Sequence, residues 1–245
     1  MTVNNLDLSF KNHIQTLRAI SVLLVFFYHL KIEYFNKGYL GVDIFFVISG
    51  FVITQSIYKN FFINRKVDIF YFFTRRIKRI IPNLIFILSV VFILYMVIGP
   101  SEVSVWNDFI SSILGVSNFY FLYSDKGYFY NIFDNPFAHT WSLGVEEQFY
   151  LIFPFIFFFI FGIFKKDHKT FVYSISLLII SSFLLSLYFF SINPDISFYF
   201  SPLRFWELGW GCFLFLIEKK IPKNHSIRNL SFLLLILLIF SDFNI

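Results

Sequence analysis

Long apolar runs alternate with short polar stretches along the chain. A bilayer core about 30 Å thick is crossed by about 20 residues of helix. Runs of roughly this size recur at 14–32, 40–58, 80–99, 104–123, 141–164, 171–191, 203–218 and 230–243. The pattern predicts an all-α fold, a polytopic integral membrane helical bundle with about seven or eight transmembrane or re-entrant segments. No repeat or flexible linker interrupts it, so residues 1–245 are predicted to form a single membrane domain.

Lys and Arg gather in three of the connecting stretches, and this indicates the orientation of the helices. Short basic loops stay on the cytoplasmic side of a membrane, so we expect three stretches at the inner face: 59–79, 165–169 and 219–228. The other connections are mainly acidic and are expected outside. One more crossing at 104–123 would place 165–169 outside. We therefore predict that 104–123, which contains several polar residues, is re-entrant or interfacial.

The composition excludes an ordinary soluble domain. Of the 245 residues, 58% are hydrophobic and only 14% are charged, whereas soluble domains carry about 25% charged residues. The net charge of +5 could suggest a nucleic-acid partner. Because the basic residues lie between apolar runs, membrane topology explains them better, and no nucleic acid is expected. Cys212 is the single cysteine, which excludes an internal disulfide and a cysteine-rich metal cluster, and no metal site is predicted.

Two ionisable residues of the first helix define a polar stripe. An ionisable group inside a spanning helix costs about 2.5 to 3.5 kcal/mol on insertion scales, so it needs a partner or a function. Arg18 and His29 are eleven residues apart, which returns to within about 20° of the same helical face. We expect Arg18 toward the cytoplasm and His29 toward the outer surface. The histidine could also simply hydrogen-bond a neighbouring helix.

Further polar residues of the helices are predicted to reach the outer half of the membrane under the same topology: Asp43, Glu146, Glu147, Arg204 and Glu207. A histidine beside a carboxylate can act as a general base toward a hydroxyl, and it can equally relay protons. Because consecutive helical residues diverge by about 100°, only one of Glu146 and Glu147 can point squarely into a shared cavity. The stripe Asp43, Val47, Gly50 and Thr54 also suits close helix packing through small residues. Arg204 and Glu207 have the i, i+3 spacing of an ion pair, which could be purely structural.

The inner face carries a different pattern, a cluster of cations at the start of the third segment. This cluster contains Arg75, Arg76, Lys78 and Arg79. Guanidinium groups bind phosphate oxygens in a bidentate manner, so a phosphate site is one interpretation. Ordinary anchoring at the inner membrane surface is the other.

Five motifs in order resemble the acyltransferase-3 family of bacterial membrane proteins, which includes O-acetyltransferases of O-antigen, peptidoglycan and other surface glycans. Arg18 followed by His29 after ten residues resembles its first-helix signature, and Gly41 to Phe51 resembles its second. Arg76 and Arg79 match its Arg-x-x-Arg stretch. His139 to Tyr150 resembles its Trp-Ser-Leu and Glu-Glu-Gln-Phe-Tyr block, and Arg204 to Gly211 an Arg-x-Trp-Glu element.

The resemblance implies a membrane O-acetyltransferase with cytoplasmic acyl-CoA, usually acetyl-CoA, as donor and a hydroxyl of a cell-surface or lipid-linked carbohydrate, such as lipopolysaccharide, as acceptor. No permanently bound cofactor is expected, and the location implied is the bacterial inner membrane. The resemblance assigns three groups of residues. The catalytic group is His29, Glu146, Glu147 and Asp43, the donor-binding group is Arg18, Arg75, Arg76 and Arg79, and the substrate-binding group is Trp141, Ser142, Arg204 and Glu207. We expect His29 to activate the acceptor or carry the acyl group, with Glu146 or Glu147 orienting it.

The length of the chain and its intramembrane charges bear on how far the resemblance holds, and two other functions stay open. Family members typically have about ten spanning helices, so this chain is expected to be short at its C-terminal end. A transporter or flippase for a surface-polymer precursor would also need intramembrane charges, although no inverted repeat with paired broken helices is evident. A purely structural membrane subunit is a third reading, but it would not require His29 and Glu147 at matching depth.

Overall fold

The computed structural model describes residues 12–64, 69–99, 105–124, 135–164 and 168–218. Its elements are α1 (Asn12–His29), η2 (Glu33–Phe35), α2 (Leu40–Asn64), α3 (Ile69–Ile98), α4 (Trp106–Ile113), α5 (Ser117–Tyr123), α7 (Thr140–Phe157), η3 (Phe158–Ile163), α8 (His168–Ile192), α9 (Pro194–Tyr199) and α10 (Ser201–Ile217). The expected all-α fold is confirmed for these residues, which contain no strand. The predicted segment 230–243 lies outside the described residues.

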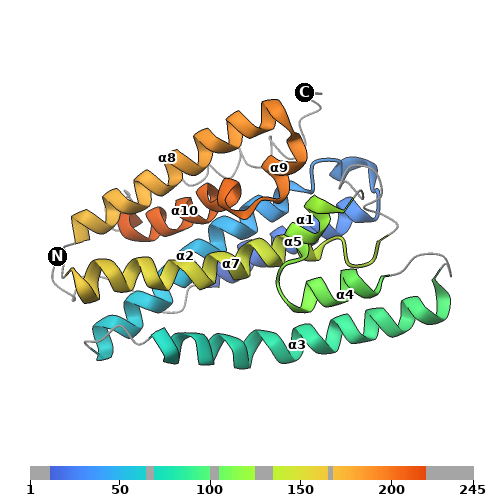
Figure 1. Cartoon of the computed structure of the whole chain (residues 1–245), viewed down its shortest axis with the longest axis horizontal. Coiled ribbons are helices and arrows are strands. Elements are labelled where there is room, and N and C mark those ends of the chain that lie inside the picture. The colour runs from blue at the N-terminus through green and yellow to red at the C-terminus, as the bar shows by residue number, and fades with distance from the viewer. Residues whose placement is uncertain (1–11, 65–68, 100–104, 125–134, 165–167, 219–245) are drawn as a thin grey trace.

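Within the described residues, four helices are long and apolar enough to cross a membrane: Leu40–Phe61, Ile69–Ile98, Thr140–Ile163 and His168–Ile192. α3 begins at Ile69, eleven residues before the predicted segment 80–99, so the cluster of basic residues lies inside α3 and not before it. α1 and α10 have 18 and 17 residues and are therefore about 27 and 26 Å long at 1.5 Å per residue. Both run alongside the longer helices (Figure 1).

The segment 104–123 does not form one spanning helix, as the basic loops required. It consists of α4 and α5, of eight and seven residues, and each is only about 10 to 12 Å long. Gly115 separates them with φ +67°, a left-handed conformation that glycine adopts without strain. As a result, the end of α2 and the starts of α3 and α8 lie at one end of the bundle, and α4 and α5 lie at the other (Figure 1).

Polar contacts fasten the α4–α5 segment to the start of α7. Asp108 of α4 is fully buried, and its Oδ2 accepts a hydrogen bond from Nδ2 of Asn135 at 3.2 Å. The Ser112 hydroxyl lies 2.7 Å from that of Thr140. Buried polar groups are stable only when they are paired in this way, so these contacts fix the non-spanning segment against the bundle.

α10 packs most extensively against α2 and α8. A Cβ on Gly50 or on Gly211 would come closer than 3.0 Å to the main chain of the opposite helix. The Cys212 thiol donates to the Gly50 carbonyl at 3.4 Å. Small residues therefore let α2 and α10 touch through their backbones, as the stripe in α2 predicted.

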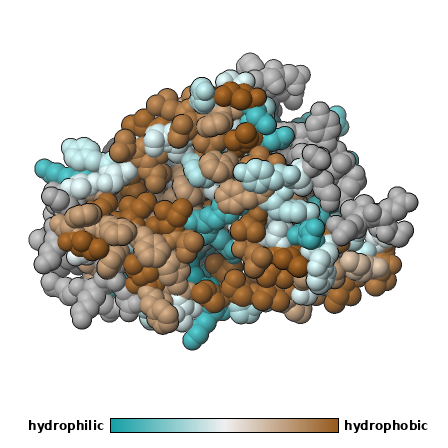
Figure 2. Space-filling view, viewed as in Figure 1, coloured by the Kyte–Doolittle hydropathy of each residue, from teal (hydrophilic) through white to brown (hydrophobic). Residues whose placement is uncertain are grey.

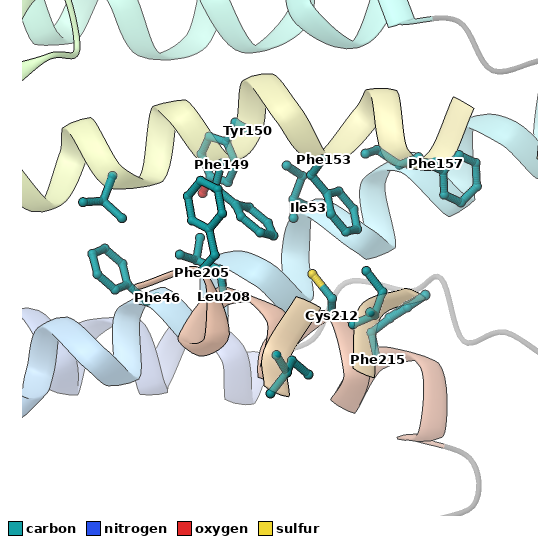
Figure 3. Packing of buried hydrophobic residues seen from close by; sticks show 14 of the residues in the cluster. Phe46, Ile53, Phe149, Tyr150, Phe153, Phe157, Phe205, Leu208, Cys212 and Phe215 are labelled. Carbon is teal, nitrogen blue, oxygen red and sulfur yellow. The ribbon is translucent and has the colours of Figure 1, made fainter. Parts of the chain in front are cut away.

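Phenylalanine fills the space between α7, α2 and α10. Figure 3 shows Phe149, Phe153 and Phe157 of α7 pointing toward residues of α2 and α10. The rings of Phe149 and Phe153 stack at 5.2 Å between centroids, and Phe149 meets Phe205 edge-on at 5.2 Å. Offset and edge-to-face contacts of this kind suit aromatic quadrupoles. The core is thus a continuous aromatic layer, and the polar site residues lie beside it.

Candidate functional site

One face of α7 carries a polar stripe. His139, Glu146 and Tyr150 are separated by seven and four residues, so at about 100° per residue they point to nearly the same side. The Tyr150 hydroxyl donates a hydrogen bond to Oε1 of Glu146. From His139 to Tyr150 the stripe covers about 16 Å of the helix axis, which is about half the thickness of a bilayer core.

A matching stripe on α1 runs antiparallel to it. His29 is an electrostatic neighbour of His139, and Arg18 is an electrostatic neighbour of Glu146. Arg18 and His29 are about 16 Å apart along α1. The polar stripe of α1 is therefore about as long as the stripe from His139 to Tyr150 on α7. The predicted common face of Arg18 and His29 therefore lies along the polar face of α7. We call these residues together, Arg18 and His29 of α1 with His139, Glu146 and Tyr150 of α7, the polar track.

The inner end of this track holds two half-buried arginines. The Arg76 guanidinium lies over the Tyr150 ring, with Cζ 3.6 Å from the ring centroid. Arg18 lies near the Phe45 ring at 5.9 Å, and its buried Nε has no hydrogen-bond partner among the described residues. Arg75 and Arg79 are exposed on α3. Of the four arginines predicted to bind the donor, the structure thus brings Arg18 and Arg76 together and leaves Arg75 and Arg79 exposed on the surface.

Glu146 belongs to this inner group. Its carboxyl group is buried beside Ser49 and Tyr150, within electrostatic range of Arg76 and Arg18. It lies seven residues beyond His139, about 10 Å further along α7, and its charged neighbours are arginines and not the two histidines. Its part in orienting His29 stays a prediction.

The outer end of the track holds the two histidines. The His139 side chain is exposed at the surface, but nearby protein removes part of the water around its ring. This partial burial, together with the neighbouring His29, lowers the pKa of His139, while a hydrogen bond to the Pro136 main chain opposes the shift. His139 is therefore neutral at neutral pH, and one of its ring nitrogens can accept a proton.

Asp43, Arg204 and Glu207 form one ionic cluster between α2 and α10. Nη2 of Arg204 lies 2.6 Å from Oδ1 of Asp43, and its Nε lies 3.2 Å from Oε1 of Glu207. The Asp43 side chain is 36% exposed and that of Glu207 only 2%. The predicted i, i+3 pair between Arg204 and Glu207 is thus present, and Asp43 of α2 extends it.

Trp141 and Ser142 lie near this cluster and near the outer histidines. The Arg204 guanidinium lies 5.7 Å from the Trp141 ring, and Trp141 is itself buried against Phe198, with the ring centroids 4.2 Å apart. The Ser142 hydroxyl donates to the His139 carbonyl at 3.1 Å. Their predicted role in binding substrate stays a prediction, and the contacts of Trp141 are those of a core residue.

Glu147 points to a different side from Glu146, as the 100° step predicted. Its Oε2 lies against Gly115, where any Cβ would collide with it. The next residue, Gln148, donates from Nε2 to the Gly115 carbonyl at 2.9 Å and to Asn118 Oδ1 at 2.8 Å. Its Oε1 accepts from the Ser201 hydroxyl. This amide network joins α7 to α5 and α10.

Several polar residues of the site were absent from the sequence-based set, although the sequence carried a signal for two of them. His139 and Tyr150 lie at i−7 and i+4 from Glu146, the spacing of a single helical face. Gln148 and Asn118 had no such signal, because they meet from segments 30 residues apart. Figure 2 shows hydrophilic residues gathered in the middle of one face, between apolar areas on both sides.

The family model described as an acyltransferase domain, that of the acyltransferase-3 family, matches residues 12–243. The chain belongs to the acyltransferase-3 family. Its five predicted motifs fall on α1, α2, α3, α7 and α10 of the bundle. With its apolar helices, this acyltransferase-3 chain is a multi-pass membrane protein.

Curated relatives of this acyltransferase-3 chain include O-acetyltransferase OatA of Staphylococcus aureus (strain NCTC 8325 / PS 47). It is 33% identical over 214 residues, which are 84% of this chain and 36% of the relative. A putative O-acetyltransferase of Staphylococcus aureus (strain COL) is 36% identical over 238 residues, which are 91% of this chain and 39% of the relative. The chain thus spans little more than a third of the length of these relatives. No solved structure matches it.

Proposed function

We propose that this chain is the membrane part of an O-acetyltransferase that moves an acetyl group from acyl-CoA, on the cytoplasmic side, to a hydroxyl of a cell-surface carbohydrate. The observation that carries the proposal is the polar track, which has arginines at its inner end and histidines at its outer end. The names of the relatives support the reaction class. The inner membrane of a bacterium is the proposed location.

The inner arginines suit the phosphates of the donor. Arg18 and Arg76 supply two positive charges and the Glu146 carboxyl group at most one negative charge, so these three residues together can attract an anion. The unpaired Nε of Arg18 gives a buried donor to a ligand oxygen. Arg75 and Arg79 are exposed on the same helix and would attract the nucleotide from the cytoplasm.

His29 is the proposed base at the outer end. It takes the proton of the acceptor hydroxyl as the oxygen attacks the thioester carbonyl, the carbon–sulfur bond breaks, and the CoA sulfur leaves as thiolate and is protonated. Alternatively His29 carries the acetyl group between the two substrates. His139 beside it is neutral at neutral pH and can accept or relay the proton. Asp43, Glu147, Trp141, Ser142, Arg204 and Glu207 complete the proposed catalytic and acceptor-binding groups.

The test uses purified protein reconstituted in vesicles with radiolabelled acetyl-CoA and an envelope glycan fraction isolated from the host. His29→Ala should lower transfer of label to the glycan by at least 100-fold, since general-base catalysis contributes about 10² to 10⁴. His13→Ala is the matched control, because His13 is an exposed histidine of the same helix. Normal transfer by His29→Ala would refute the assignment. If the wild type moves glycan across the vesicle without labelling it, the transporter reading is correct.

A further inference from the structure

Arg76 is held more closely than any other arginine whose ring contacts the structure records. Its Cζ lies 3.6 Å from the Tyr150 centroid, whereas the contacts of Arg18 and Arg204 with aromatic rings are at 5.6 to 5.9 Å. The second aromatic neighbour of Arg76 is Phe72, at 5.4 Å. A guanidinium stacked at this distance on a buried ring is held in place and cannot readily turn toward solvent.

The ring under Arg76 is itself fixed. Tyr150 is 7% exposed, and its hydroxyl donates to the Glu146 carboxyl group, four residues earlier on the same helix. Tyr150 therefore cannot rotate without breaking a buried hydrogen bond, which is costly. Arg76, Tyr150 and Glu146 form a chain of contacts from α3 into the centre of α7.

Glu146 also supplies the charge that keeps the cations inside. Long basic side chains near a helix end tend to extend toward water, and Arg76 has this choice because α3 begins only seven residues earlier. The buried carboxyl group, within range of both Arg76 and Arg18, opposes that movement. Arg75 and Arg79 are exposed on the same helix and show the orientation that an unrestrained arginine takes here.

We propose that Tyr150 and Glu146 are positioning residues that hold Arg76 inside the bundle to bind a phosphate of the acyl-CoA donor. This rests on the proposed function and assigns Glu146 to donor binding instead of to the orientation of His29. Tyr150 provides the stacking surface, and Glu146 fixes that surface and balances the charge. The donor phosphate then meets a guanidinium whose position is already set, so little side-chain entropy is lost on binding.

The experiment measures binding of CoA to the purified full-length chain by calorimetry, which needs no acceptor. Glu146→Gln and Tyr150→Leu should each weaken CoA binding about tenfold, the effect of one lost charge-assisted hydrogen bond. Tyr150→Phe should weaken it less, because the stacked ring remains. Glu33→Gln and Tyr173→Phe are matched controls, since both residues are exposed and lie on η2 and α8, and they should bind CoA like the wild type.

Coupling to Arg76 distinguishes positioning from a general effect on the fold. Arg76→Gln should weaken CoA binding, and Glu146→Gln added to it should weaken binding little further, because the group that Glu146 positions is already gone. A loss of CoA affinity in the double variant that equals the sum of the losses in the two single variants would overturn the proposal. So would unchanged CoA affinity of Glu146→Gln and Tyr150→Leu beside a weakened Arg76→Gln, and the proposed function would then survive. A wild type that binds no CoA would overturn both.

Discussion

Replacing Gly211 with alanine should separate α2 from α10. A Cβ at this position would lie 2.6 Å from the Phe51 nitrogen and closer still to the Val47 carbonyl oxygen. Both are main-chain atoms, which cannot rotate away. Ordinary contact begins at 3.4 Å, so the helices must move apart by at least 0.8 Å at this crossing. Forcing extra volume into a packed contact costs about 1 to 3 kcal/mol. The Arg204–Asp43 pair, which bridges the same helices, would be stretched as well.

The measurement is the midpoint of thermal unfolding of the purified chain in detergent. A cost of that size corresponds to a decrease of roughly 2 to 12 °C for a chain of this length. Gly162→Ala is the matched control: it is an exposed glycine of η3, and its Cβ would meet only a Phe158 side chain at 3.0 Å. If Gly211→Ala unfolds at the same temperature as the wild type and as the control, α2 and α10 do not touch through their backbones at Gly211.

Three other perturbations can be checked by the same unfolding assay. Gln148→Leu should cost about 2 to 4 kcal/mol, because it removes the hydrogen bonds to Gly115, to Asn118 of α5 and from Ser201 of α10 and leaves these buried partners unpaired, whereas Gln15→Leu on the exposed side of α1 should cost little. Arg204→Met should cost about 3 to 5 kcal/mol by leaving the buried Glu207 carboxyl group and the partly exposed Asp43 carboxyl group unpaired. Asp43→Asn in the same chain should restore part of this, and a further decrease in stability would contradict the pairing. Because the folded-state pKa of His139 is lowered, the unfolded chain binds this proton more readily, so stability present above about pH 6.5 should be lost as the pH falls. His139→Gln should flatten that part of the profile, and an unchanged profile would count against the shift.

The helices could be read from the sequence, which also predicts the side of the membrane on which each connection lies. The length of apolar runs is set by the thickness of a bilayer, and the placement of basic residues by the positive-inside rule. The non-spanning character of 104–123 also followed, because only that choice kept the basic loops on one side. The common faces of Arg18 and His29, and of the small residues in α2, followed from the helical repeat alone. These features depend on local spacing, which a single sequence contains.

The partners of the charged residues could not be read in this way. Asp43 and Arg204 are 161 residues apart, and Glu146 meets Arg76 and Arg18 from three different helices. The sequence predicts Glu146 in the outer half of the membrane beside His29, whereas in the structure it lies about two turns along α7 from His139, within electrostatic range of Arg76 and Arg18. Helical periodicity gives the direction of a side chain around its own axis and says nothing about the sliding of one helix along another. The sequence alone therefore determined which residues face inward, while the packing of α1, α3, α7 and α10 decided which of them meet, because helix register is set by side-chain contacts between elements far apart in the chain.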